Sequence, residues 1–114
     1  MAREGKSARN LVRLGKQEFA HVFREGERAT AGAVVVYRAV NGGIRPRVGV
    51  AVSRKVGKAV RRNRIRRLLR EVFRCNPDWF KAGYDYVLLA RETAVGEGYQ
   101  DIARQVREAL KRLT

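Results

Sequence analysis

The sequence predicts a single small domain of the α+β class, a sandwich in which helices cover a short sheet. The chain of 114 residues has room for one domain with a modest core, and 45% of its residues are hydrophobic, as in ordinary folded proteins. Segments with helical periodicity alternate with Val-rich segments in the order α-β-β-α-β-α. We expect residues 1–12 to form a mobile basic arm and residues 13–114 to form the domain.

The first helix is expected over residues 16–24, because Gly26 provides a stop signal after it. Phe19 and Phe23 are four residues apart and therefore share one face of this helix. With Tyr37 on the next element, they have two interpretations. They form either a platform on which unpaired bases stack or ordinary core packing against the sheet. Periodicity alone favours core packing.

Two Val-rich strands are expected next, over residues 33–40 and 47–53, with the turn signal Asn41-Gly42-Gly43 between them. We expect the second strand to run antiparallel to the first. Its side chains alternate, with Val48, Val50 and Val52 on one face and Gly49, Ala51 and Ser53 on the other. The face of small residues allows close approach of a helix or of a ligand backbone.

Residues 54–74 are the most basic part of the chain, with ten of the 26 basic residues and one acid, Glu71. Gly57 precedes a helix expected over residues 58–74, and Asn76-Pro77-Asp78 ends it. One side of this helix is apolar and carries Ile65, Leu68, Leu69, Val72 and Phe73. The opposite side spans about 140° and carries Arg62, Asn63, Arg66, Arg67, Arg70 and Arg74. The helix can therefore pack on a core while it presents a row of guanidinium groups.

Two further elements complete the domain. Residues 84–90 form a continuous apolar run, which predicts a central, buried strand. Because a helix separates this strand from residues 47–53, the two strands are expected to form a parallel crossover pair. Residues 99–113 carry an apolar stripe at helical spacing and predict the last helix.

The charge of the chain indicates the class of its partner. The formal net charge is +15 and the pI is about 11.3, an imbalance that destabilises a compact chain unless a polyanion offsets it. A merely solvated helix face would mix both signs of charge, and a membrane-surface helix would need its large apolar side chains free to enter lipid. We therefore predict that the basic helix binds nucleic acid.

Several classes of chemistry lack their residues in this sequence. Cys75 is the single cysteine, which excludes an internal disulfide and indicates a reducing, cytosolic compartment. His21 is the single histidine, too few for a zinc site, and neither a phosphate-binding Gly-rich loop nor a pair of carboxylates on one element is present. No apolar run is long enough to span a membrane. We expect no catalytic residue in this chain.

Residues 47–74, RVGVAVSRKVGKAVRRNRIRRLLREVFR, closely resemble the signature of the bacterial ribonuclease P protein component. The hallmark of that family is the core Arg62-Asn63-Arg64 within this run. Weaker similarity extends over most of the chain, at Leu14, Phe19, Phe23, Gly26 and Tyr37 and at Asp85-Tyr86-Val87 and Ala90-Arg91.

The resemblance implies an accessory subunit of an endoribonuclease. In this family a large RNA carries the active site and removes the 5′ leader from precursor tRNA, while the small basic protein binds that RNA and holds the leader. The expected cofactor is Mg²⁺, held mainly by the RNA partner, and the expected location is the cytoplasm, without an obligate protein partner. The resemblance also implies a left-handed crossover between the parallel strands, whereas general rules favour the right-handed form.

The resemblance also implies two sets of binding residues. The set expected to contact the catalytic RNA is Arg54, Lys55, Lys58, Arg62, Asn63, Arg64, Arg66, Arg67, Arg70 and Arg74. The set expected to line a cleft for the single-stranded leader is Phe19, Phe23, Val35, Tyr37, Gly49, Ala51 and Ser53. The alternative function is a structural RNA-binding protein, such as a ribosomal protein, because small basic α+β domains occur there too.

Overall fold

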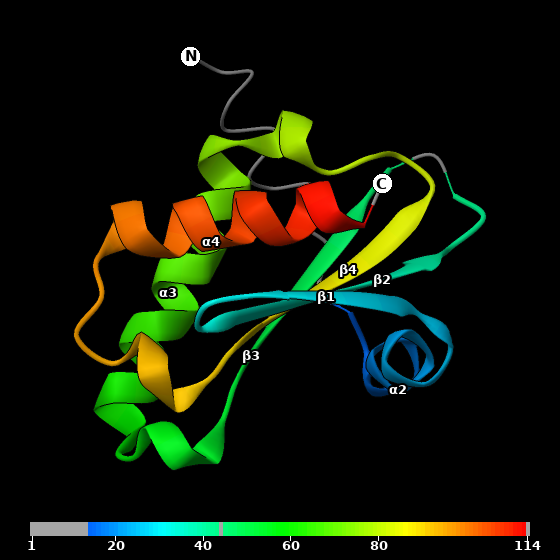
Figure 1. The fold of residues 1–114 in the computed structure, drawn as a ribbon. Helices are drawn as coiled ribbons and strands as arrows, with labels where there is room; N and C mark the ends of the chain where they lie inside the picture. The colour runs from blue at the N-terminus through cyan, green and yellow to red at the C-terminus, as the bar shows by residue number, and fades with distance from the viewer. Residues whose placement is uncertain (1–13, 44, 114) are drawn as a thin grey trace.

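The structure, a computed structural model, describes residues 14–43 and 45–113. The predicted basic arm, residues 1–12, lies outside the described residues. The elements are α2 (Lys16–Glu25), β1 (Glu27–Ala31), β2 (Val34–Val40), β3 (Arg47–Val52), α3 (Ala59–Cys75), β4 (Tyr84–Ala90) and α4 (Tyr99–Arg112), as Figure 1 shows. Three short 3-10 turns join them, η1 (Arg54–Val56), η2 (Pro77–Trp79) and η3 (Glu92–Ala94).

The four strands form one mixed sheet in the order β1-β2-β4-β3. β4 is central and buried, as predicted, and pairs antiparallel with β2 and parallel with β3. The strands β2 and β3 do run antiparallel, but they are not neighbours, because β4 lies between them. One row across the sheet illustrates this order, since Val87 of β4 faces Tyr37 on one side and Gly49 on the other.

The strand β1 is absent from the predicted order α-β-β-α-β-α, which is wrong in this respect. Its sequence, ERATA, lacks the alternation of large apolar and polar residues that indicates a strand. β1 lies at the edge of the sheet, where only Ala31 of its residues is buried. Pairing with β2, rather than the side chains of β1 themselves, therefore defines this strand.

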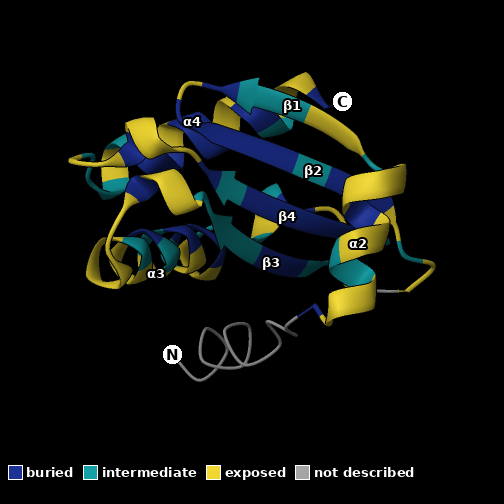
Figure 2. Cartoon of the chain, turned by 90° about the horizontal axis from the view of Figure 1, so that it is seen from below, coloured by how far each residue is buried: buried dark blue, intermediate teal, exposed yellow. Residues whose placement is uncertain are grey.

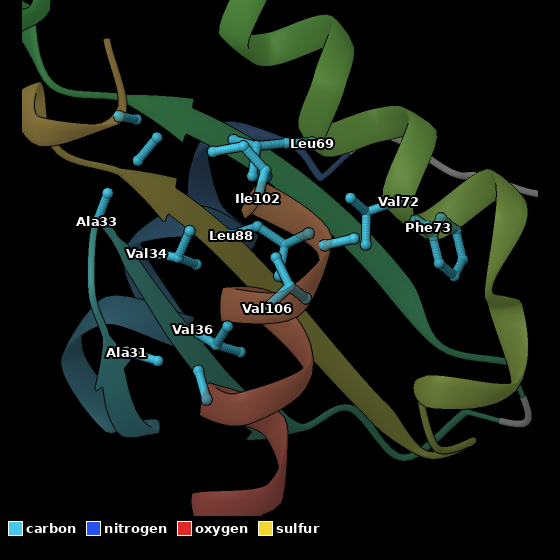
Figure 3. Packing of buried hydrophobic residues seen from close by; sticks show 14 of the residues in the cluster. Ala31, Ala33, Val34, Val36, Leu69, Val72, Phe73, Leu88, Ile102 and Val106 are labelled. Carbon is cyan, nitrogen blue, oxygen red and sulfur yellow. The ribbon is translucent and has the colours of Figure 1, made fainter. Parts of the chain in front are cut away.

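The sheet separates two helical layers, with α3 and α4 on one face and α2 on the other (Figures 1 and 2). The larger core lies between the sheet and the α3–α4 pair, where strand residues Val34, Val36, Val48 and Leu88 meet Ile65, Leu69, Val72, Ile102 and Val106 of the helices (Figure 3). A smaller cluster lies under α2, formed by Leu14, Val22, Ala39 and Val87 with Phe19, Tyr37 and Ala51 against it. The two predicted faces of β3 are confirmed by this division, because its valines join the larger core and Ala51 joins the smaller one.

The parallel pair β3–α3–β4 is confirmed, and its crossover is left-handed. Seen from the face covered by α3, with the carboxyl ends of the strands pointing up, the chain passes from β3 over α3 to β4 on its left (Figures 2 and 3). The hand agrees with the resemblance and differs from the general preference for right-handed crossovers.

A buried ion pair joins the parallel strands on the α2 face. Asp85 of β4 is 3% exposed and accepts hydrogen bonds from Nε and Nη2 of Arg47 on β3, both at 2.8 Å. Asn41 Nδ2 donates a third hydrogen bond to Asp85 Oδ1 at 2.9 Å. Hydrogen bonding to Asp85 raises the pKa of Arg47, which keeps the guanidinium charged and the pair intact.

Candidate nucleic-acid interface

A short turn directs the chain from β3 into the basic helix. The Ser53 hydroxyl accepts a hydrogen bond from the backbone N–H of Lys55 at 3.2 Å and so begins η1. Gly57 ends the turn at φ 115°, a conformation that L side chains rarely adopt. Ser53 was predicted to line the leader cleft, and the structure places its hydroxyl in this turn. The exposed Arg54, Lys55 and Lys58 lie on η1 and at the N-cap of α3, at one end of the helix.

The helix α3 has the two sides that the sequence predicts. Ile65, Leu69, Val72 and Phe73 are buried against the sheet and α4. We define the basic ridge as the polar side chains of the opposite side, Arg62, Asn63, Arg66, Arg67 and Arg70. Of these, Arg62 and Arg66 are half-buried and the other three are exposed.

Hydrogen bonds hold parts of the basic ridge in position. Arg66 Nη1 donates to Asn63 Oδ1 at 2.8 Å, one turn back along α3. Arg62 Nη1 donates to the carbonyl oxygen of Gly57 at 3.1 Å. Outside the ridge, Arg64 Nη2 donates to the carbonyl oxygen of Glu97 at 3.2 Å, so this residue points toward η3. These acceptors are neutral, and each arginine therefore keeps its full charge for an external partner.

The arginines of the basic ridge form no ion pair with an acidic side chain of the described residues. Among the described residues, the predicted RNA-binding cations form one ion pair with an acid, between Arg74 and Glu71. The hydrogen bond that Arg74 donates to Glu71 lowers the pKa of the Glu71 carboxyl, which keeps this acid ionised. The other eight of these cations make no such pair within residues 14–43 and 45–113. The arginines of the basic ridge therefore repel one another, and binding of a polyanion would relieve this repulsion.

The aromatic face, defined as Phe19, Phe23 and Tyr37, lies between α2 and β2. The ring centroids of Phe19 and Phe23 are 6.2 Å apart, and Phe23 meets Tyr37 edge-on at 4.6 Å. Phe23 is 42% exposed, whereas Phe19 and Tyr37 are half-buried and pack on the smaller core. The rings therefore pack on the sheet, as the core-packing interpretation predicts, whereas stacking of bases on the exposed ring of Phe23 stays a prediction.

The strand residues that were predicted to line the leader cleft are only partly exposed. Gly49 is buried, and a Cβ there would stand 2.6 Å from Cζ of Phe19 and 3.2 Å from Cδ1 of Leu14. Val35 is also buried, at 6% exposure, while Ala51 is half-buried. The small residue at position 49 therefore allows helix α2 to approach the sheet closely. The sequence had left open whether a helix or a ligand backbone makes this approach.

The basic ridge and the aromatic face lie on opposite faces of the sheet, with the edge strand β3 between α3 and α2 (Figure 2). An RNA that reaches both surfaces must pass around that edge. Arg61 also lies exposed at the start of α3 and was not among the predicted contacts, although its place in the basic run is a signal for it.

Two further properties of the described residues bear on function. In residues 14–43 and 45–113, no three His, Cys, Asp or Glu side chains are grouped so that they could hold a metal ion. In the same part of the chain, no helix is both long and apolar enough to cross a bilayer.

Comparison with known proteins agrees with this geometry. The sequence model of the family described as ribonuclease P matches residues 9–114. The chain belongs to the ribonuclease P protein family. The ribonuclease P protein component of Clostridium kluyveri is 41% identical over 106 residues, which cover 90% of this chain and 95% of the relative. That of Clostridium botulinum strain Loch Maree is 41% identical over 104 residues, with coverage of 90% and 93%.

Solved structures of ribonuclease P proteins share the fold. The protein from Thermotoga maritima superposes with a TM-score of 0.81 at 31% identity and covers 90% of this chain and 98% of its own. The protein from Staphylococcus aureus superposes with a TM-score of 0.80 at 28% identity, with coverage of 90% and 94%. The chain is thus the protein subunit of ribonuclease P, a ribonucleoprotein of tRNA processing, and these relatives do not favour a ribosomal protein.

Proposed function

We propose that this subunit binds the catalytic RNA of ribonuclease P through the basic ridge and holds the 5′ leader of precursor tRNA on the aromatic face. The RNA partner carries out the hydrolysis of the phosphodiester bond, with Mg²⁺ ions held mainly by that RNA. The protein contributes affinity and substrate choice, and it acts in the cytoplasm.

The basic ridge is the observation that carries the proposal. Its arginines stand on the outer side of a helix whose inner side is fixed in the core, and none of them pairs with an acid among the described residues. Guanidinium groups form charge-assisted hydrogen bonds with phosphate and stay protonated at every relevant pH. A subunit with a net charge of +15 also lowers the repulsion between the catalytic RNA and a second RNA.

Leader binding is supported by the exposed ring of Phe23 and its neighbour Tyr37. Stacking of bases on aromatic rings tolerates many sequences, because every base has a π-face. A leader differs from one precursor tRNA to another, so a general processing enzyme needs such tolerance.

The proposal is tested by cleavage and binding assays of the reconstituted holoenzyme at low Mg²⁺. We expect the protein alone to leave precursor tRNA intact, and the protein with its RNA to cleave it faster than the RNA alone. We also expect the protein to tighten binding of precursor tRNA more than binding of mature tRNA. Equal tightening of both would show that the leader is not held by the protein.

A variant pair separates the aromatic face from general RNA affinity. Phe23→Ala should reduce the preference for precursor over mature tRNA by about tenfold, because stacking contributes about 1–3 kcal/mol per base. Val40→Ala truncates another exposed apolar side chain, 68% exposed at the end of β2, and should leave the preference unchanged. Equal behaviour of the two variants would contradict the assignment of the leader to this face.

A further inference from the structure

A pocket on the side of α4 lies apart from both the basic ridge and the aromatic face. Its volume is about 450 Å³, and it opens between the end of α3, the turn η2 and the first half of α4. The lining residues are Asn76, Trp79, Tyr99, Gln100, Ala103, Arg104 and Arg107. We propose that this pocket binds a single unpaired nucleotide of RNA, with its base against Trp79 and Tyr99 and its phosphate at Arg107.

The aromatic side chains supply a surface for a base. Trp79 on η2 and Tyr99 at the start of α4 are both half-buried, so each ring is anchored and still presents part of its surface. Tyr99 is further held by a hydrogen bond from Asn76 Nδ2 to its hydroxyl oxygen at 3.0 Å. A tyrosine is neutral near pH 7, and burial raises the pKa of the Tyr99 hydroxyl further, so the ring carries no charge that would repel a phosphate. Flat aromatic walls of this kind favour stacking of a base.

The arginines supply the charge for a phosphate. The guanidinium carbon of Arg107 lies over the Trp79 ring, 5.6 Å from its centroid, so a cation stands beside the aromatic surface that lines the pocket. Arg107 forms no ion pair with an acid among the described residues, and no lining residue of the pocket is acidic. Arg104 is paired only with Asp101, at 3.4 Å and with both side chains well exposed, so its charge is weakly compensated.

Polar groups at the rim can meet the edge of a base. Gln100 is exposed, and its amide makes no hydrogen bond within residues 14–43 and 45–113. Asn76 donates from Nδ2 to the carbonyl oxygen of Val72 and to Tyr99, which leaves Oδ1 as an acceptor. Anchored rings, an uncompensated guanidinium and free amide groups form the combination that recognises a nucleotide, whereas phosphate alone would need only the arginines.

The pocket has a built-in reporter, because Trp79 is the single tryptophan of the chain. Adenosine 5′-monophosphate serves as the probe, with ribose 5-phosphate, adenosine and inorganic phosphate compared at matched ionic strength. We expect saturable quenching of tryptophan fluorescence by the nucleotide, and at least about fivefold weaker apparent affinity for each of the other three. The titration contains neither the catalytic RNA nor precursor tRNA, so its outcome is independent of the proposed function.

A charge-matched pair of variants assigns the phosphate to its residue. Arg107→Gln should weaken nucleotide binding about fivefold or more, and because Arg107 is exposed we expect an unchanged melting temperature. Arg28→Gln removes the same charge from β1, outside the lining of the pocket, and should bind as the parent chain does. Quenching that does not saturate, inorganic phosphate or adenosine binding as well as the nucleotide, or equal affinity of both variants would each overturn the proposal.

Discussion

Phe19 of α2 lies directly against Gly49 of β3, and a Cβ built on that glycine would stand 2.6 Å from Cζ and 3.0 Å from Cε2 of the ring. The contact fixes how closely α2 approaches the sheet. Because Phe19 adjoins Phe23, which in turn meets Tyr37 edge-on, the same contact also sets the position of the aromatic face.

Gly49→Ala should therefore change stability and leader binding together. The added methyl group displaces the Phe19 ring, at a cost of about 1–3 kcal/mol in the free energy of unfolding, which urea titration measures. We also expect weaker binding of precursor tRNA, because Phe23 moves with the helix. Gly43→Ala is the control, since a Cβ there meets no atom closer than 3.4 Å. An unchanged free energy of unfolding in Gly49→Ala would show that Phe19 moves freely.

The basic ridge predicts a specific change in salt dependence. Replacing Arg66 and Arg70 together by Ala should weaken binding of the catalytic RNA by tenfold or more. The slope of log affinity against log salt should flatten by about 0.7–0.9 for each lost phosphate contact. The matched control replaces Arg24 and Arg28, which lie at the end of α2 and on β1, away from α3. A slope that stays the same in the ridge variant would mean that these two side chains do not touch phosphate.

Glu71 is the one acid on α3, and its removal should strengthen RNA binding. Glu71→Gln takes a negative charge from beside the basic ridge, and we expect affinity for the catalytic RNA to rise about twofold to fivefold at low salt. Filter binding at two salt concentrations measures this gain, which should shrink at the higher one. An affinity that falls instead would indicate that the ion pair with Arg74 positions the RNA-binding surface.

The ion pair of Glu71 with Arg74 also has a predicted pH dependence. Hydrogen bonding from Arg74 lowers the pKa of Glu71 in the folded protein. The folded state therefore binds this proton less readily than the unfolded state, so the small stabilisation by the pair is present above the ordinary pKa of a glutamate. It is lost as the pH falls through the lowered value. Comparison of the melting temperatures of the parent and Glu71→Gln between neutral and acid pH should show their difference vanish at low pH.

The buried ion pair of Asp85 with Arg47 should contribute far more to stability than the pair of Glu71 with Arg74 does. Asp85→Asn removes the ionised acceptor of three hydrogen bonds, two from Arg47 and one from Asn41, in a site where the carboxylate is 3% exposed. Because the Arg47 side chain is still 34% exposed, we expect a loss of about 2–3 kcal/mol, at the lower end for a broken buried pair. Glu25→Gln breaks the exposed pair with Arg24 and should cost less than about 0.5 kcal/mol. Similar urea midpoints for the two variants would contradict this account.

Local patterns in the sequence determined most of the elements of this protein. The apolar stripe of α3, with Ile65 and Leu69 inward and Arg67 and Arg70 outward, follows from a helical period of 3.6 residues alone. A continuous apolar run predicted that β4 lies in the centre of the sheet, because such a run must be covered on both faces. The run around Arg62-Asn63-Arg64 also indicated the family correctly.

Only the tertiary structure decided which segments meet. β1 has no periodic pattern of its own and exists through its pairing with β2, and the order of strands places β4 between β2 and β3. Gly49 is matched to Phe19 by the packing of α2 on the sheet, and Trp79 meets Arg107 because η2 and α4 come together. The physical reason is that periodicity records which side of an element is buried, whereas the identity of its neighbour depends on contacts between residues far apart in the chain.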